Sequence, residues 1–210
     1  MEILQYFYEK REVVVFATLR HVEVSLIAVL LSVLIAIPLG ILITRYKRMA
    51  HLVVNSANVG QTIPSLAILG MVIPILGIGV KPAVFALVLR GILPILNNTY
   101  SGIENVDRSV IEAGRGLGMR SREILTLVEL PLSFPVIMAG IRTATVLSIS
   151  VATLAALIGA GGLGDLIFQG IVMADRNLLL AGSIPTALLA IGADLLLGVL
   201  EKRLKKGGAS

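Results

Sequence analysis

The chain contains no cysteine and no tryptophan, and it has only two histidines among its 210 residues. Without cysteine there are no disulfide bonds, thiolate metal ligands or thiol nucleophiles. His21 and His51 stand alone, with no second metal ligand at a suitable spacing and no serine and carboxylate arranged as a triad. The sequence therefore lacks the catalytic set of an enzyme, and we expect neither a bound metal nor catalysis by this chain.

Charged residues are also scarce, at 15% of the chain, whereas 56% of the residues are hydrophobic and the mean hydropathy is +0.94. This apolar excess requires a bilayer as solvent, whose hydrocarbon core is crossed by a helix of about 20 apolar residues. In lipid every backbone amide needs a partner, so such segments cross as helices. The sequence thus predicts an all-α integral membrane protein with five transmembrane helices, at residues 23–44, 53–77, 82–98, 135–158 and 178–200.

The formal net charge is +5, and the basic residues collect at the edges of apolar stretches, where membrane topology explains them without a nucleic-acid partner. One set of loops carries eleven of them and the opposite set carries five. The positive-inside rule places the richer side in the cytoplasm, with the N-terminus outside and the C-terminus inside. We expect an extracytoplasmic or interfacial segment over 1–22, a transmembrane domain over 23–200 and a basic cytoplasmic tail over 201–210. His21 and His51 are expected at the membrane edges.

A long segment at 99–134 separates the third and fourth predicted helices and faces the cytoplasm in this orientation. It exceeds a minimal connection between helices. Ser109 is expected to cap a short helix that begins near Val110, and the glycines that follow indicate a break before a second short helix. Pro131 is expected to end that second helix where the chain re-enters the membrane. The segment predicts a pair of short helices on the cytoplasmic surface.

Residues 112–114 (Glu-Ala-Gly) of this segment are followed at fixed offsets by Gly118 and by residues 128–131 (Val-Glu-Leu-Pro). The pattern resembles the EAA loop of ABC-importer permeases, with two departures: glycine replaces the second alanine and valine replaces isoleucine. Glycine costs about 1 kcal/mol relative to alanine inside a helix, so Gly114 either loosens the helix or sits at a close contact. The resemblance implies that a separate ATPase is contacted through Glu112, Ala113, Gly114, Gly116, Gly118, Leu130 and Pro131.

The resemblance extends to residues 62–67, 93–100 and 152–164, which look like permeases of the osmoprotectant branch of these importers. That branch carries glycine betaine, carnitine, choline or proline betaine. The resemblance implies a prokaryotic cell membrane, a second permease subunit, two ATPase subunits and an extracytoplasmic binding protein. It also implies that ATP and magnesium are bound by the ATPase and that this chain holds no cofactor. The alternatives are an importer for another small solute such as an amino acid, or an autonomous channel or secondary transporter.

Residues 159–164 satisfy the glycine pattern G-x-G-x-x-G of dinucleotide-binding folds. That fingerprint requires a preceding strand in a βαβ unit, whereas here it follows a predicted membrane helix. The glycines instead predict a tight turn that leads into a short helix over 165–172. The chain also lacks the P-loop pattern, which places ATP binding on another subunit.

Polar residues interrupt the second apolar stretch, although a helix facing lipid would avoid them. Asn55, Asn58 and Thr62 recur at helical spacing, and Pro64 frees a backbone carbonyl at a similar depth. They predict either a polar lining of a translocation pathway or hydrogen bonds between helices. The expected pathway residues are Asn55, Asn58, Gln61, Thr62, Ser65 and Arg90.

Ionisable residues inside apolar stretches need a partner or a polar cavity, because an unpaired charge in the membrane is costly. Arg142 and Asp194 lie several residues from the cytoplasmic ends of their helices and predict a structural ion pair, with substrate contact as the alternative. Arg90 has no evident partner, and it either lines the pore or extends its head group to the interface. Phe85 is the only aromatic residue well inside a predicted membrane helix.

Overall fold

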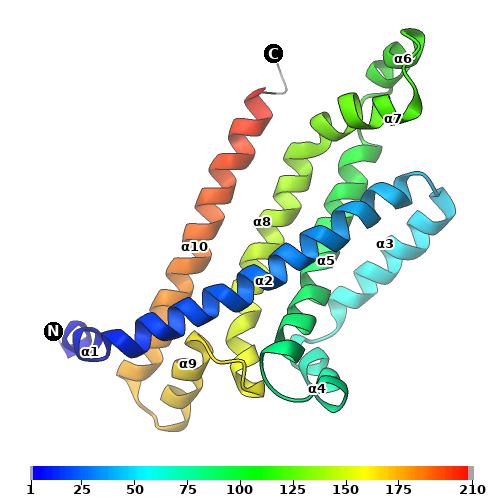
Figure 1. Ribbon diagram of the computed structural model, residues 1–210. Helices are drawn as coiled ribbons and strands as arrows, with labels where there is room; N and C mark the ends of the chain where they lie inside the picture. Colours follow the sequence, from blue (N-terminus) through cyan, green and yellow to red (C-terminus); the bar gives the residue numbers. More distant parts are fainter. Residues whose placement is uncertain (1, 208–210) are drawn as a thin grey trace.

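The computed structural model describes residues 2–207, and within them the chain is helical and has no strand (Figure 1). This confirms the predicted all-α class. The elements in chain order are α1 (Glu2–Glu9), α2 (Arg11–Thr44), α3 (Lys47–Thr62), α4 (Ser65–Leu76), α5 (Val80–Glu104), α6 (Arg108–Gly116), α7 (Ser121–Ile124), the π-helical turn η1 (Leu125–Glu129), α8 (Leu130–Ala155), the 3-10 turn η2 (Ala156–Ile158), α9 (Leu163–Val172) and α10 (Arg176–Gly207).

Four helical segments of the described chain are long and apolar enough to cross a membrane: α2, α5, the run Ser121–Ile158 and α10. The helices α3 and α4 together form a fifth candidate, although they are bent by 99° at the break between them. The stretch predicted as one helix over 53–77 is therefore two helices. Ile63 is extended, with φ −68° and ψ 125°, because a following proline disfavours the helical region. Pro64 also lacks the N–H that would continue the helix.

The helix α2 begins at Arg11, well before the predicted start of the first membrane helix at residue 23. Arg20 pairs with Glu23 at 2.6 Å on its surface, and such pairs at a spacing of three support a helix through a polar region. His21 is 1% exposed, and its Nε2 lies 2.9 Å from the carbonyl oxygen of Ile149 on α8. This histidine is a buried contact between two helices.

The helix α5 packs against both α2 and α8, and small residues allow these helices to approach closely. A Cβ added to Gly140 of α8 would lie 2.9 Å from the carbonyl oxygen of Pro94 and 2.7 Å from Cβ of Asn98 on α5. One added to Gly40 of α2 would lie 2.7 Å from Cβ of Thr99. Small residues are the usual basis of close packing in membranes, since lipid gives little hydrophobic drive for helix association.

A glycine turn after η2 leads into α9. Gly159, Gly161 and Gly162 have φ values of 75°, 79° and 95°, which residues with a Cβ rarely adopt. The predicted turn and short helix are therefore present, and the helix begins at Leu163.

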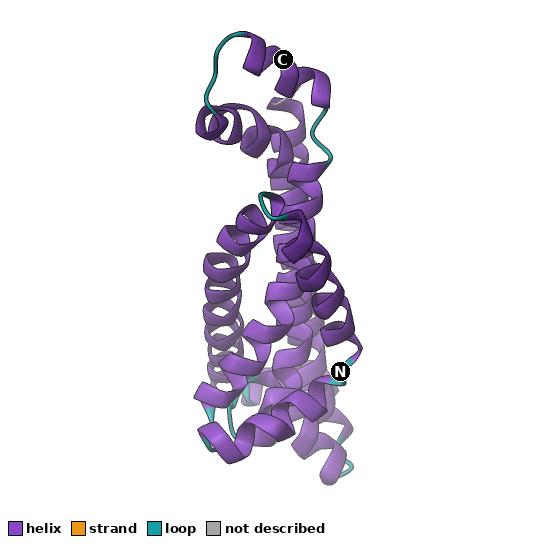
Figure 2. Ribbon diagram, turned by 90° about the vertical axis from the view of Figure 1, so that its right-hand side faces the viewer, coloured by secondary structure: helices purple, strands orange, loops and turns teal. Residues whose placement is uncertain are grey.

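The two ends of the molecule carry different elements (Figure 1). The helices α6 and α7 lie at the same end as the C-terminal part of α10, whereas α4 and α9 lie at the opposite end. The two chain termini are also far apart along the long axis (Figure 2). Only 6% of an 18-residue apolar stretch of α10 is buried in the structure. This helix therefore offers a long apolar face to lipid or to another membrane helix.

Candidate functional site

The short helix α6 is fixed at its start by Asp107. The Asp107 carboxylate accepts a hydrogen bond of 2.9 Å from the backbone N–H of Ser109, and this bond holds the pKa of Asp107 below its usual value. The prediction placed the cap at Ser109 and the helix start near Val110, whereas α6 begins at Arg108. The prediction was wrong by two residues because aspartate, another strong N-capping residue, stands just before the first turn.

A glycine turn reverses the chain direction after α6, which ends at Gly116. Gly118 has a φ of 83°. Its N–H donates to the carbonyl of Arg115 at 2.9 Å, and the N–H of Met119 donates to the carbonyl of Gly114 at 3.1 Å. These bonds satisfy carbonyls at the helix end, and the positive φ explains why position 118 favours glycine. The predicted break between two short helices is present.

Gly114 is buried where α6 meets the second short helix. A Cβ at this position would lie 3.2 Å from Sδ of Met119 and 3.7 Å from Cγ1 of Ile124. The geometry therefore supports a close contact at Gly114 and not a loosened helix. Glu112 and Ala113 lie on the same helix and are exposed.

The knob formed by α6, the glycine turn and α7 exposes apolar side chains. Leu117 is 84% exposed and Val110 is 41% exposed. Charged residues of the same segment are exposed as well, among them Glu112, Arg115 and Arg120. Exposed apolar side chains among charged ones are common in protein-binding surfaces.

The helix α7 continues through η1 into α8, so Pro131 does not end the second helix as predicted. Pro131 instead lies in the first turn of α8, immediately after the π turn. The N–H of Leu130 donates to the carbonyl of Leu125, five residues earlier. This wider turn takes up the interruption that the missing proline N–H causes. Leu130 is half-buried and Pro131 is exposed.

Glu129, the last residue of the π turn, forms an ion pair with Arg45 at the end of α2. Both terminal nitrogens of the Arg45 guanidinium donate to the two carboxylate oxygens. The Glu129 side chain is 7% exposed and the Arg45 side chain 42% exposed. Glu129 belongs to the 128–131 motif, whose local sequence shows no partner for it. Its charge within the apolar run from Leu125 to Leu132 was the available signal.

The predicted pathway residues lie on α3 and at the break that follows it. The side chains of Asn55, Asn58, Gln61 and Thr62 are exposed in the single chain, and Ser65 at the start of α4 is half-buried. The α3 members are spaced three or four residues apart, so they gather on one side of the helix. This polar face is open to water or to another subunit.

Two residues of α5 contact α3 and the break. Nη1 of Arg90 donates to the backbone carbonyls of Gln61 at 3.0 Å and Ile63 at 3.3 Å, which gives Arg90 the partner that the sequence did not reveal. These carbonyls lie where Pro64 interrupts helical bonding. Nδ2 of Asn97 donates to Oδ1 of Asn58 at 3.1 Å. Part of the polar face thus makes bonds between helices, as the alternative interpretation expected.

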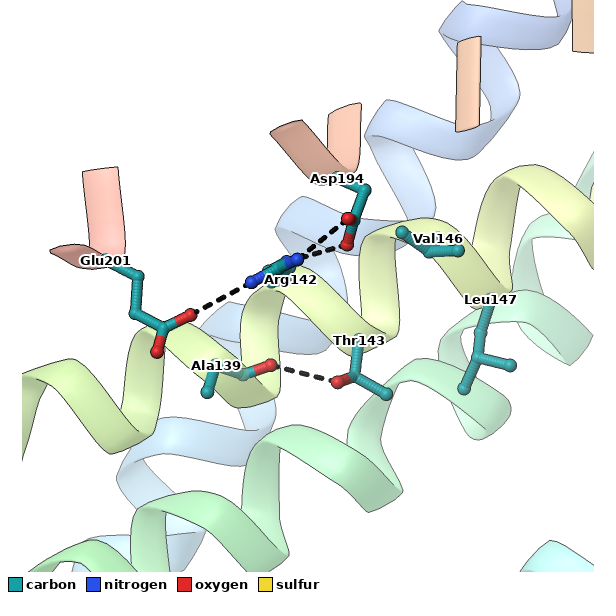
Figure 3. A pocket seen from close by; sticks show the side chains of 7 residues that line it. All are labelled: Ala139, Arg142, Thr143, Val146, Leu147, Asp194 and Glu201. Carbon is teal, nitrogen blue, oxygen red and sulfur yellow. Dashed lines mark hydrogen bonds and ion pairs between the residues drawn. The ribbon is translucent and has the colours of Figure 1, made fainter. Parts of the chain in front are cut away.

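Arg142 of α8 and Asp194 of α10 form the ion pair expected from the sequence (Figure 3). Nε donates to Oδ1 at 2.6 Å and Nη2 to Oδ2 at 2.7 Å. Nη1 also lies 3.3 Å from Oε2 of Glu201, a third member that the sequence analysis did not identify. Such two-point contacts are the strong form of the arginine–carboxylate pair. A cavity of about 520 Å³ adjoins the pair, lined also by Ala139, Thr143, Val146 and Leu147.

Comparisons with known proteins agree with this architecture. The chain is 47% identical over 206 residues to the choline transport system permease protein OpuBB of Bacillus subtilis (strain 168), which covers 98% of this chain and 95% of that protein. It is 46% identical over 202 residues to the carnitine transport permease protein OpuCB of Listeria monocytogenes, at 96% and 93% coverage.

A solved structure of the MetNI methionine ABC transporter in an inward-facing conformation shares the fold, with a TM-score of 0.82 at 18% sequence identity. The match covers 91% of this chain and 95% of that chain. Residues 36–206 also match the family described as binding-protein-dependent transport system inner membrane component. Because this match and the two relatives cover most of the chain, the protein belongs to this family of multi-pass membrane permeases.

Proposed function

We propose that the chain forms the conduit of an ABC importer that brings a small quaternary ammonium osmoprotectant, such as choline, carnitine or glycine betaine, into the cell. The observation that carries this proposal is the 47% identity to a choline permease over nearly the whole chain. Similarity of this extent covers both the knob and the polar face of α3. An importer for another small solute is the second candidate, favoured only by the fold shared with a methionine transporter.

The proposed orientation has the N-terminus outside and the knob and C-terminus in the cytoplasm. Eleven basic residues on the knob side against five on the other side support it. The knob and the C-terminal part of α10 lie at one end of the molecule, as this orientation requires (Figure 1).

The proposed contact with the ATPase is the knob, through Glu112, Ala113, Gly116, Gly118 and the exposed Leu117. The buried Gly114 supports it from beneath by allowing α6 to pack on the second short helix. Leu130 and Pro131 lie where this helix run enters the membrane part. The assembly has two ATPase subunits, which bind ATP and magnesium, and an extracytoplasmic binding protein.

A second permease subunit completes the proposed pathway. The polar face of α3 and the apolar face of α10 are both uncovered in the single chain. This supports a partner subunit that encloses the polar face of α3 and packs on the apolar face of α10. Asn55, Asn58, Gln61, Thr62 and Ser65 line the pathway in this proposal. Their polarity provides weak and replaceable contacts, which a conduit requires.

Arg90 lies beside this pathway in the proposal, since it holds the break between α3 and α4 through two backbone carbonyls. The Arg142–Asp194 pair is proposed as structural, because both carboxylate oxygens are occupied by the guanidinium.

The test is uptake into vesicles whose membrane carries the chain and its ATPase, with ATP inside the vesicle and the binding protein in the medium outside. We expect ATP-dependent accumulation of radiolabelled choline, carnitine or glycine betaine. Uptake of methionine or another amino acid in their place would indicate the second candidate. Uptake by vesicles that contain the chain without the ATPase would indicate a channel or secondary transporter and would contradict the proposal.

A further inference from the structure

The ion pair between Arg45 and Glu129 joins residues 84 positions apart in the sequence. Arg45 directly follows α2, and Glu129 ends the π turn between α7 and α8. The pair therefore connects the knob end of the first membrane helix to the helix run that carries the knob.

The burial of Glu129 makes this connection strong. The residue is 6% exposed, and a carboxylate removed from water to this degree is stable only with a paired cation or several hydrogen bonds. Arg45 provides a close contact from Nη2 to Oε2 and a longer one of 3.5 Å from Nη1 to Oε1, and only a guanidinium offers two such nitrogens. Because separating the two would leave a buried charge, the end of α2 and the π turn keep their relative position.

The helix run on which Glu129 lies is mechanically continuous. It extends from Ser121 to Ile158 without interruption, and α6 is packed on its start through the close contact of Gly114 with Met119 and Ile124. A continuous helix of this kind is a rigid element of the sort that carries coupling between distant sites. The π turn at residues 125–129 is its irregular point, and such turns are frequent at functional sites.

We propose that Arg45 and Glu129 are positioning residues that transmit movement of the knob to α2, so that the first membrane helix moves together with α8 when the ATPase moves. This inference rests on the proposed function, since it requires the knob to be the ATPase contact. The pair makes no contact with substrate in this role. The pair determines how much of the ATPase movement that accompanies each ATP hydrolysis is transmitted to the membrane helices.

The experiment compares Arg45→Gln, Glu129→Gln, Arg45→Lys and the exchanged pair Arg45→Glu/Glu129→Arg in the reconstituted complex. Uptake and ATP hydrolysis are both measured per assembled complex. The matched control is Glu23→Gln, which removes an exposed ion pair within α2 that joins no second element.

We expect the two glutamine variants to assemble and hydrolyse ATP while uptake per ATP hydrolysed falls about five- to tenfold, a typical size for the loss of one coupling contact. Arg45→Lys keeps the charge and loses the second of the two contacts. Its uptake per ATP hydrolysed should therefore lie between the wild-type value and that of the glutamine variants. The exchanged pair should recover part of the ratio. Glu23→Gln should match the wild type.

A wild-type ratio in the glutamine variants would overturn the coupling role while leaving the proposed function intact. A smaller amount of assembled complex with wild-type uptake and hydrolysis per complex would also overturn it, because the pair would then only stabilise the fold. If either glutamine variant does not assemble, Arg45→Lys and the exchanged pair decide the question by the same measure, the uptake per ATP hydrolysed. A wild-type complex without ATP-dependent uptake would overturn the proposed function, and the coupling role with it.

Discussion

At the scale of single residues, Gly118 is constrained by backbone conformation and not by space. Its φ is 83°, and an added Cβ would meet nothing within 4 Å. A left-handed conformation costs a residue with a Cβ about 1–2 kcal/mol, whereas asparagine tolerates it better than most residues. We expect Gly118→Leu to give a folded membrane protein with strongly reduced uptake and weakened ATPase binding, and Gly118→Asn to retain more of both. Uptake assays and co-purification with the ATPase measure the two effects. Normal uptake by Gly118→Leu would contradict the role assigned to the turn.

Substitution of Arg142 tests whether the Arg142–Asp194 ion pair has a structural role. Removing its charge by Arg142→Gln leaves Asp194 and Glu201 without the guanidinium that contacts them. We expect a lower unfolding midpoint in detergent and a partial recovery in Arg142→Gln/Asp194→Asn, because the remaining charge is then reduced. Thermal unfolding followed by circular dichroism measures this order. An unchanged midpoint together with an altered KM for uptake would instead support substrate contact, the alternative left open by the sequence.

At the scale of helices, the close approach of α5 and α8 depends on Gly140. A Cβ there meets backbone as well as side chain of α5, at 2.9 Å from the carbonyl oxygen of Pro94. Overpacking of this kind typically costs about 1–3 kcal/mol. We expect Gly140→Ala to lower the unfolding midpoint of the purified protein. The matched control is Gly192→Ala on α10, where an added Cβ meets nothing within 4 Å. Equal midpoints for the two variants would show that the helices separate without cost.

At the scale of the whole molecule, the orientation of the chain in the membrane can be measured directly. Because the chain has no cysteine, a single introduced cysteine is the only site that a thiol reagent labels. Leu117 in the knob and Val172 at the end of α9 are each 84% exposed and lie on elements at opposite ends of the molecule. We expect Leu117→Cys to react with an impermeant thiol reagent only from the cytoplasmic side, and Val172→Cys only from the outside. Labelling in intact cells and in inverted vesicles distinguishes these sides, and the reverse pattern would invalidate the proposed orientation.

The complete transporter divides binding from conduction in our proposal, because the conduit is poor in aromatic residues. Quaternary ammonium groups are held by aromatic faces at about 0.5–2 kcal/mol each. The longer helices of the structure carry Phe16 in α2, Phe85 and Tyr100 in α5 and Phe134 in α8. The three phenylalanines lie on different helices and are each at least 43% exposed.

We therefore expect calorimetry on the pore and ATPase complex without its binding protein to detect millimolar choline affinity or no binding. The same titration with the binding protein alone serves as the positive control. Micromolar affinity in the pore complex would show that the permease itself holds the substrate tightly.

The sequence by itself determined the membrane class, the all-helical class and the presence of two short helices after α5. Apolar runs in lipid have few alternatives to helices, and the glycines after α6 require a turn wherever they occur. The Arg142–Asp194 pair was also predictable, because two opposite charges in otherwise apolar helices need each other.

Only the tertiary structure decided features that depend on distant segments. The 99° bend between α3 and α4 goes beyond the local effect of Pro64, and Arg90 on α5 provides donors to the carbonyls at the break. The π turn shows a similar limit, since Pro131 was expected to end a helix that in fact continues. The Arg45–Glu129 pair joins residues 84 positions apart, and no local pattern specifies such a contact. A sequence shows which charges and backbone groups need partners, whereas the packing of α2, α5 and α8 determines which partners come within reach.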